Sequence, residues 1–128
     1  MRRRVSSGGP WEARYGYSRA VTAGDTCWVA GTTDAGPDGQ SAHPGDPDAQ
    51  ARAIFGIIKA ALAEAGFELR DVVRTRMYVT DPEHVAPVAA VHGEVFADVR
   101  PAATAVVVAA LIDPSLLVEI EVDAVRAG

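Results

Sequence analysis

Two segments that alternate between apolar and polar residues constrain the fold of this chain most strongly. Residues 118–124 read Val-Glu-Ile-Glu-Val-Asp-Ala, and residues 73–79 read Val-Arg-Thr-Arg-Met-Tyr-Val. Successive side chains of a β-strand point to opposite faces of the sheet, so this alternation predicts two strands. Each strand is expected to turn its apolar face to a covering layer and its polar face away from it.

Two further segments have helical periodicity. The first is expected to begin at an Asp46 cap followed by Pro47 and to end at Gly66. Its apolar stripe comprises Ile54, Ile57, Ile58, Ala61, Leu62 and Ala65. Four polar residues lie largely off this stripe, namely Gln50, Arg52, Lys59 and Glu64. A second stripe runs from Val85 to Val99, and its helix starts either after Asp81-Pro82 or, later, at Pro87.

The remaining segments complete an α+β pattern. Residues 102–111 are apolar at nearly every position, which predicts a strand buried on both sides, and residues 34–48 are a long loop rich in Gly, Pro and Asp. The order β-β-(β)-α-β-α-β-β predicts a single mixed sheet with two helices packed on one face. The other face keeps valine, alanine and charge, and is expected to pack against copies of the chain.

Length and composition favour one folded domain over residues 1–128. The chain is 48% apolar and 23% charged, and its net charge of -5 disfavours a general nucleic-acid binder. No apolar stretch is long enough to span a membrane. Arg2, Arg3 and Arg4 are not followed by an apolar run, so no secretory signal is predicted and a cytoplasmic location is expected.

Cysteine and histidine content limits the chemistry. Cys27 is the only cysteine, which excludes a disulfide within the chain, and its apolar surroundings predict a buried thiol rather than a nucleophile. His43, His84 and His92 lack the spacing of metal ligands, and no cofactor fingerprint is present. The sequence therefore predicts neither a metal nor a cofactor.

Four segments stand in a characteristic order. They are YGYSRAV at 15–21, DVVRTRMYVTD at 71–81, RPAATAV at 100–106 and VEIE at 118–121. In this order and spacing they resemble the reactive-intermediate deaminase family, also called YjgF-like or L-PSP endoribonuclease-like, over about 9–126. The resemblance implies a chorismate-mutase-like fold and a homotrimer that binds small molecules in clefts between subunits. It also implies hydrolysis of amino-acid-derived imines or enamines to a 2-keto acid and ammonia.

The resemblance assigns catalytic roles to Glu119 and Tyr17. Glu119 matches a family glutamate that orients the attacking water, and partial burial between subunits would raise its pKa. A solvated carboxylate and a tyrosine that only packs at an interface are the structural alternatives. Ala30 and Gly31 stand where members read Ser-Gly and use backbone groups toward the ligand, so the serine hydroxyl is absent here.

Ala103 is the main departure from the family pattern. Active members have an arginine there that pairs with the substrate carboxylate, and its loss removes about 1.5–3 kcal/mol of binding. Thr104 and Ala105 belong to the same substrate-binding segment. Arg76 and Tyr78 share one strand face and are further candidates. Arg76 or Arg74 either replaces the missing cation or pairs with Glu121 or Asp123 of an adjoining subunit.

Three functions remain in competition. The first is an imine or enamine deaminase with an atypical substrate. The second is a non-catalytic trimer that binds a small metabolite or has a regulatory role, since a fold outlasts its function. The third, an endoribonuclease or translation inhibitor, is disfavoured by the negative charge and by the lack of a histidine pair or metal site.

Overall fold

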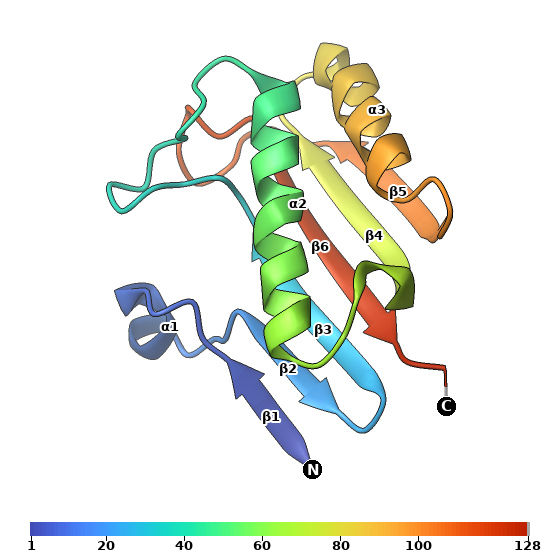
Figure 1. Cartoon of the computed structure of the whole chain (residues 1–128). Coiled ribbons are helices and arrows are strands. Elements are labelled where there is room, and N and C mark those ends of the chain that lie inside the picture. Colours follow the sequence, from blue (N-terminus) through green and yellow to red (C-terminus); the bar gives the residue numbers. More distant parts are fainter. Residues whose placement is uncertain (128) are drawn as a thin grey trace.

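The computed structural model describes residues 1–127, which form one mixed six-stranded sheet with its two long helices on one face (Figure 1). The predicted fold class is thus confirmed. The strands are β1 (Arg2–Val5), β2 (Ala20–Ala23), β3 (Thr26–Thr32), β4 (Val72–Val79), β5 (Ala102–Val107) and β6 (Val118–Val125). Their order is β1-β2-β3-β6-β4-β5, and only the β4–β5 pair is parallel.

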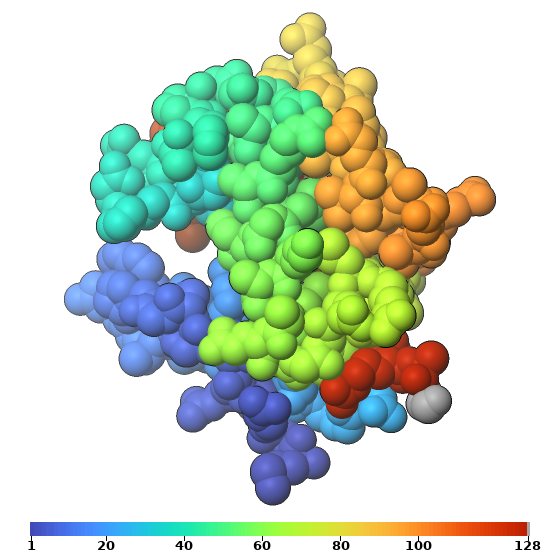
Figure 2. All heavy atoms as spheres, viewed as in Figure 1, coloured from blue at the N-terminus to red at the C-terminus, as the bar shows by residue number. Residues whose placement is uncertain are grey.

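The long helices are α2 (Pro47–Glu64) and α3 (Val85–Val95). Figure 2 shows the face that they form, with α2 between the 33–46 loop and α3. As predicted, the Asp46 side chain caps α2 by accepting a hydrogen bond from the Ala49 N–H, and Gly66 follows its end with a φ of 86°. Helix α3 starts late, because residues 82–84 form a 3₁₀ turn capped by Asp81.

A short helix, α1 (Pro10–Tyr15), was not predicted. It follows β1 and packs beside the end of the sheet rather than over its covered face (Figure 1). Proline at its first position and Gly16 in the left-handed region at its end suit such a helix. Its six residues are too few to show an apolar stripe, so hydrophobic periodicity does not predict this helix.

The core lies between the sheet and the two long helices. From β6 it receives Val118, Ile120, Val122 and Ala124, so the predicted alternation of that strand is confirmed. Cys27 is fully buried, also as predicted. In β4, Thr75, Met77 and Val79 are buried, but Val73 is exposed. The prediction for Val73 was wrong because the β4–β6 register shifts between Val72 and Arg74, and Val72 takes the inward place.

Strand β5 also departs from its prediction. All six of its residues are exposed in the chain by itself, and β5 is an edge strand paired only with β4. An apolar run is typical of a strand buried on both faces, yet it does not identify what covers those faces. The prediction of burial within the chain was therefore wrong.

Two residues of α2 also differ from the predicted stripe. Ile57 is 39% exposed, and Gln50 is fully buried. Gln50 donates to the carbonyls of His43 and Ser115 at 3.1 and 3.0 Å, and its side-chain oxygen accepts from the Leu117 N–H at 2.9 Å. Gln50 thus ties α2 to the 33–46 loop and to the 108–117 loop.

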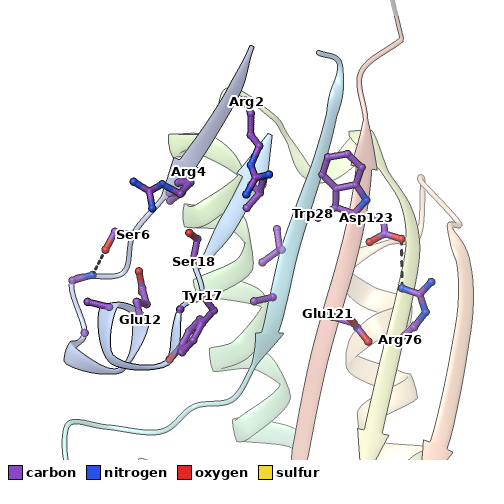
Figure 3. A pocket seen from close by; sticks show the side chains of 18 residues that line it. Arg2, Arg4, Ser6, Glu12, Tyr17, Ser18, Trp28, Arg76, Glu121 and Asp123 are labelled. Atoms are coloured by element: carbon purple, nitrogen blue, oxygen red, sulfur yellow. Dashed lines mark hydrogen bonds and ion pairs between the residues drawn. The ribbon is translucent and has the colours of Figure 1, made fainter. Parts of the chain in front are cut away.

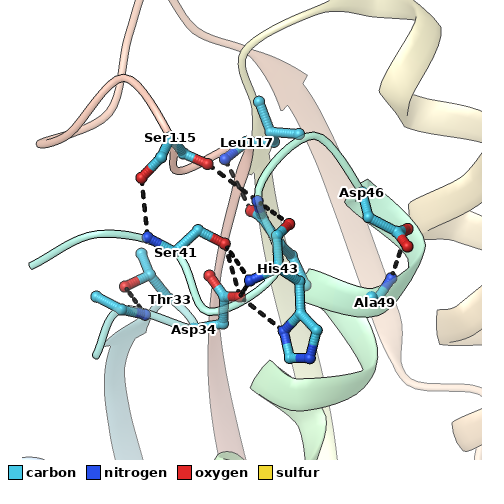
Figure 4. A network of polar contacts seen from close by, with 10 residues as sticks. Thr33, Asp34, Ser41, His43, Asp46, Ala49, Ser115 and Leu117 are labelled. Carbon is cyan, nitrogen blue, oxygen red and sulfur yellow. Dashed lines mark hydrogen bonds and ion pairs between the residues drawn. The ribbon is translucent and has the colours of Figure 1, made fainter.

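The 33–46 loop has a polar centre of its own (Figure 4). The buried Asp34 carboxylate accepts hydrogen bonds from the Ser41 hydroxyl at 2.8 Å and from the His43 N–H at 3.2 Å. The His43 ring nitrogen Nδ1 lies 3.1 Å from the same oxygen. The Ser41 N–H donates to the Ser115 hydroxyl at 2.8 Å, which joins this loop to the 108–117 loop.

Candidate active site

Side chains on the uncovered face of β4 and β6 interact diagonally. The register places Arg76 opposite Glu121 and Tyr78 opposite Glu119. The contacts lie one pair further along: Arg76 Nη1 is 3.4 Å from Asp123 Oδ2, and the Tyr78 hydroxyl donates to Glu121. Glu119 stands at the end of this row, and no residue among 1–127 gives it a hydrogen bond or an ion pair.

Gly31 makes room for the Glu119 carboxylate. A β-carbon at position 31 would lie 3.1 Å from Glu119 Cδ and closer still to one carboxylate oxygen. The β3–β6 register shifts between Val29 and Thr32, so Gly31 lies in an irregular part of the ladder. The absence of a side chain at this position therefore fixes where the Glu119 carboxylate can stand.

Arg19 binds the backbone of β3 at the same position. Its guanidinium Nη2 donates to the carbonyls of Ala30 and Gly31 at 2.8 and 2.7 Å. Burial raises the pKa of Glu119 above its ordinary value, and the charge of Glu121 acts in the same direction, while the Arg19 cation partly opposes them. The net result is a carboxyl group that takes up a proton more readily than an exposed glutamate.

A pocket of about 340 Å³ opens at Glu119. Its polar lining consists of Glu119, Glu121 and Tyr78, with Gly31 beside them. Its apolar lining comes from the 108–117 loop that follows β5, namely Val108, Ala110 and Leu111. A carboxylate with a raised pKa and no partner among residues 1–127, facing a small half-apolar pocket, is suited to general acid–base chemistry on a small molecule.

Comparison with known proteins places this arrangement in a family. A model of the family described as Endoribonuclease L-PSP matches residues 10–126. The chain belongs to the Endoribonuclease L-PSP family. The structure resembles that of Rv2704 from Mycobacterium tuberculosis, a member of the YjgF/YER057c/UK114 family, with a TM-score of 0.89 and 47% identity. That match covers 98% of this chain and 100% of Rv2704.

Curated relatives agree with this assignment to the L-PSP family. An uncharacterized Streptomyces coelicolor protein, SCO2049, is 44% identical over 97% of this chain and 92% of its own length. A RutC family protein of Pyrococcus horikoshii is 35% identical over 82% of each chain. The family resemblance drawn from the sequence is thus confirmed.

The predicted site residues of this L-PSP family member fall into three places. Glu119, Gly31 and Tyr78 line the small pocket. Tyr17, Ala30 and Arg76 line a larger, open hollow of about 1160 Å³ between the α1 region and the uncovered sheet face (Figure 3). Glu121 borders both hollows, which shows that they adjoin.

Ala103, Thr104 and Ala105 lie on the exposed strand β5 and line neither hollow in this chain. Arg76 pairs with Asp123 of the same chain, whereas the sequence-based alternative was a pair with an acid of an adjoining subunit. Sequence reasoning missed Arg19 and Glu121 as parts of the site. A signal for Glu121 was available, because it lies two positions from Glu119 on the same strand face, whereas nothing local marks Arg19.

Metal chemistry receives no support from the described residues. Within residues 1–127, no three or more His, Cys, Asp and Glu side chains are grouped so that they could hold a metal ion. His43 contacts Asp34, and the His92 ring nitrogen Nε2 lies 2.8 Å from the Thr75 hydroxyl. No helix within residues 1–127 is long and apolar enough to cross a membrane.

Replacing Arg19 by glutamine is expected to raise the pKa of Glu119 further. The variant loses the cation that favours the charged carboxylate but keeps a donor for the carbonyls of Ala30 and Gly31. Titration of the Glu119 side-chain carboxyl carbon by NMR measures the change. Arg14→Gln, on the surface of α1, is the matched control and should leave that pKa unaltered. A Glu119 pKa that is equal in the Arg19 variant and the parent would contradict this electrostatic role.

Replacing Gly31 by alanine is expected to push the Glu119 carboxylate out of its position without unfolding the protein. The group that must move is the end of a flexible side chain, so the free energy of unfolding should change by less than about 1 kcal/mol. Released into water, the carboxyl group should show a pKa closer to its ordinary value in the same NMR titration. Gly56→Ala is the control, because an added β-carbon there meets nothing within 4 Å. An unchanged Glu119 pKa in the Gly31 variant would show that the glycine does not govern this position.

Proposed function

We propose that this chain hydrolyses a reactive imine or enamine to a carbonyl compound and ammonia. The observation that carries the proposal is the Glu119 carboxylate, which lacks a partner among residues 1–127, has a raised pKa and stands against Gly31 at a small pocket. A general base needs to hold a proton only briefly. It is most effective when its pKa lies near the working pH, and the raised pKa of Glu119 is closer to neutral pH than that of an exposed glutamate.

The proposed reaction uses Glu119 for each proton transfer. The carboxylate takes a proton from water as the water oxygen attacks the iminium carbon, which gives a carbinolamine. That proton then passes to the nitrogen, and the C–N bond breaks while the carbinolamine hydroxyl gives its proton to Glu119 and becomes the carbonyl group. Ammonia takes up this last proton and leaves as ammonium, so Glu119 is a carboxylate again. Tyr78 and Glu121, joined by their hydrogen bond at the pocket wall, help to position the ligand.

The site is proposed to be completed by neighbouring copies in a homotrimer. Strand β5 exposes all six of its residues, and five of them are alanine or valine. Ala103, Thr104 and Ala105 line neither hollow of their own chain, so as substrate-binding residues they would serve the cleft of an adjoining subunit. Tyr17 on the larger hollow fits the same arrangement. Light scattering coupled to size-exclusion chromatography gives the mass of the assembly directly.

A non-catalytic, ligand-binding trimer is the second candidate. The specific observation in its favour is Ala103, since a scaffold that has lost a substrate-binding arginine can keep its pocket without turnover. RNA cleavage is less favoured, although the family description names it, because the pocket carries two carboxylates that would repel phosphate groups.

The proposal is tested by following ammonia release from imines. An amino acid oxidase or an amine oxidase generates the imines in place, and the parent protein is compared with Glu119→Gln and Ala103→Arg. Acceleration by the parent that is lost in Glu119→Gln supports the hydrolase. Activity found only in Ala103→Arg would show a competent scaffold whose natural role is binding. No acceleration by any of the three proteins would contradict the proposal.

A further inference from the structure

Within the described residues 1–127, the lining of the small pocket carries acids and no basic side chain. Two of its seven lining residues are the acids Glu119 and Glu121, and none is lysine, arginine or histidine. The Tyr78 hydroxyl occupies only one oxygen of Glu121, so both acids present acceptor positions to the pocket. A concave site lined by one sign of charge concentrates ligands of the opposite sign.

Two arginines close to these strands already have other partners. Arg19 is directed to the carbonyls of Ala30 and Gly31, and Arg76 is paired with Asp123. Neither residue lines the small pocket. A carboxylate on a ligand would therefore meet two like charges and no cation among the lining residues that this chain supplies. The lining thus repels acidic ligands and also lacks a group that attracts them.

Another part of the pocket lining is apolar. Val108, Ala110 and Leu111 offer hydrocarbon surface in the same pocket as the acids. A volume of about 340 Å³ suits a small molecule with a short alkyl or aryl group. Such a molecule can place its apolar group on this wall and direct a cationic nitrogen at the carboxylates.

We infer that the pocket selects small cationic imines that carry an apolar substituent and no carboxylate. This inference rests on the proposed hydrolase function and names its substrate class. The reaction is R–CH=NH₂⁺ + H₂O → R–CHO + NH₄⁺: the water oxygen forms the C–O bond, the C–N bond breaks, and no electrons are exchanged with an outside reagent. The class of reaction that supplies such a substrate is the oxidation of an apolar primary amine.

Binding of three stable probes tests the selectivity without turnover. Isobutylamine carries the cation and the alkyl group, valine adds a carboxylate to them, and isobutyrate has the alkyl group and the carboxylate alone. By calorimetry, isobutylamine is expected to bind about tenfold tighter than valine, with isobutyrate weakest. Valine or isobutyrate binding as tightly as isobutylamine overturns the inference, and so does the absence of isobutylamine binding.

Variants of the two acids test whether the preference for isobutylamine arises in the small pocket. Glu119→Gln and Glu121→Gln should each weaken isobutylamine binding about tenfold, and two separate variants guard against one that fails to fold. Glu64→Gln, an exposed acid on α2 on the other side of the sheet, should bind like the parent. A preference for isobutylamine that persists unchanged in both pocket variants overturns the inference.

Measured rates of imine hydrolysis distinguish a failure of this inference from a failure of the proposed hydrolase function. Selective amine binding without hydrolysis of any imine supports the selectivity and removes the proposed hydrolase. Equal rates for carboxylate-free imines and for 2-imino acids support the hydrolase and overturn the selectivity.

Discussion

Replacement of Glu119 by glutamine is expected to lower kcat/KM for imine hydrolysis by about 1000-fold, the contribution typical of a positioned general base. Glutamine keeps the length and shape of the side chain, so the pocket and the contact with Gly31 are preserved. What is lost is the ability to accept a proton from water and return it to nitrogen. Steady-state rates on the best imine of the panel measure the effect, and a change below about tenfold would show that Glu119 is not the base.

The stability of this variant provides the control for folding. A carboxyl group whose pKa is raised in the folded state binds a proton more readily there than in the unfolded chain. Its contribution to stability is thus lost as the pH rises from its ordinary pKa through the raised value. Glu119→Gln cannot ionise, so it should gain stability relative to the parent between pH 4 and pH 7. Urea unfolding at both values tests this, and a relative loss at pH 7 would contradict the raised pKa.

Replacement of Gln50 by alanine is expected to lower the free energy of unfolding by about 3 kcal/mol. The side chain is fully buried and makes three hydrogen bonds to backbone groups of two loops. Alanine leaves the Leu117 N–H and the carbonyls of His43 and Ser115 without these partners, and each such group in a protein interior costs free energy. Urea denaturation at a fixed protein concentration gives the difference.

Gln40→Ala is the matched control for the Gln50 variant. Gln40 is exposed on the 33–46 loop, so its replacement should change the free energy of unfolding by less than about 0.5 kcal/mol. Gln50→Ala should also weaken ligand binding, because the 108–117 loop that Gln50 holds supplies the apolar pocket wall. A loss of stability similar to that of Gln40→Ala would mean that the three hydrogen bonds contribute little.

The sequence predicts the sheet and helices well because their signals are local. Alternation over 118–124 is tied to a strand with one buried face, and Asp46 and Gly66 mark helix ends through their own backbone geometry. Gln50 was predicted off the apolar stripe on polarity alone. Its position, four residues before Ile54, nonetheless places it on the buried face of α2, so spacing predicts its burial better than polarity does.

Other features depend on contacts between distant segments. The exposure of Val73 results from a register shift against β6, and the exposure of β5 from its place at the sheet edge. Arg19 reaches the site through carbonyls 11 and 12 residues away in the chain. The role proposed for Glu119 came from family resemblance, whereas its lack of a partner among residues 1–127 follows from the diagonal pairing of β4 and β6. No local pattern encodes these relations.

The buried position of Cys27 makes its thiol a natural probe of local unfolding. The thiol is the only one in the chain, lies fully buried in β3, and has a pKa that burial raises. An alkylating reagent attacks the thiolate, so the folded chain reacts only when β3 becomes exposed. The rate of alkylation therefore reports how often the middle of the sheet opens, without the introduction of a label.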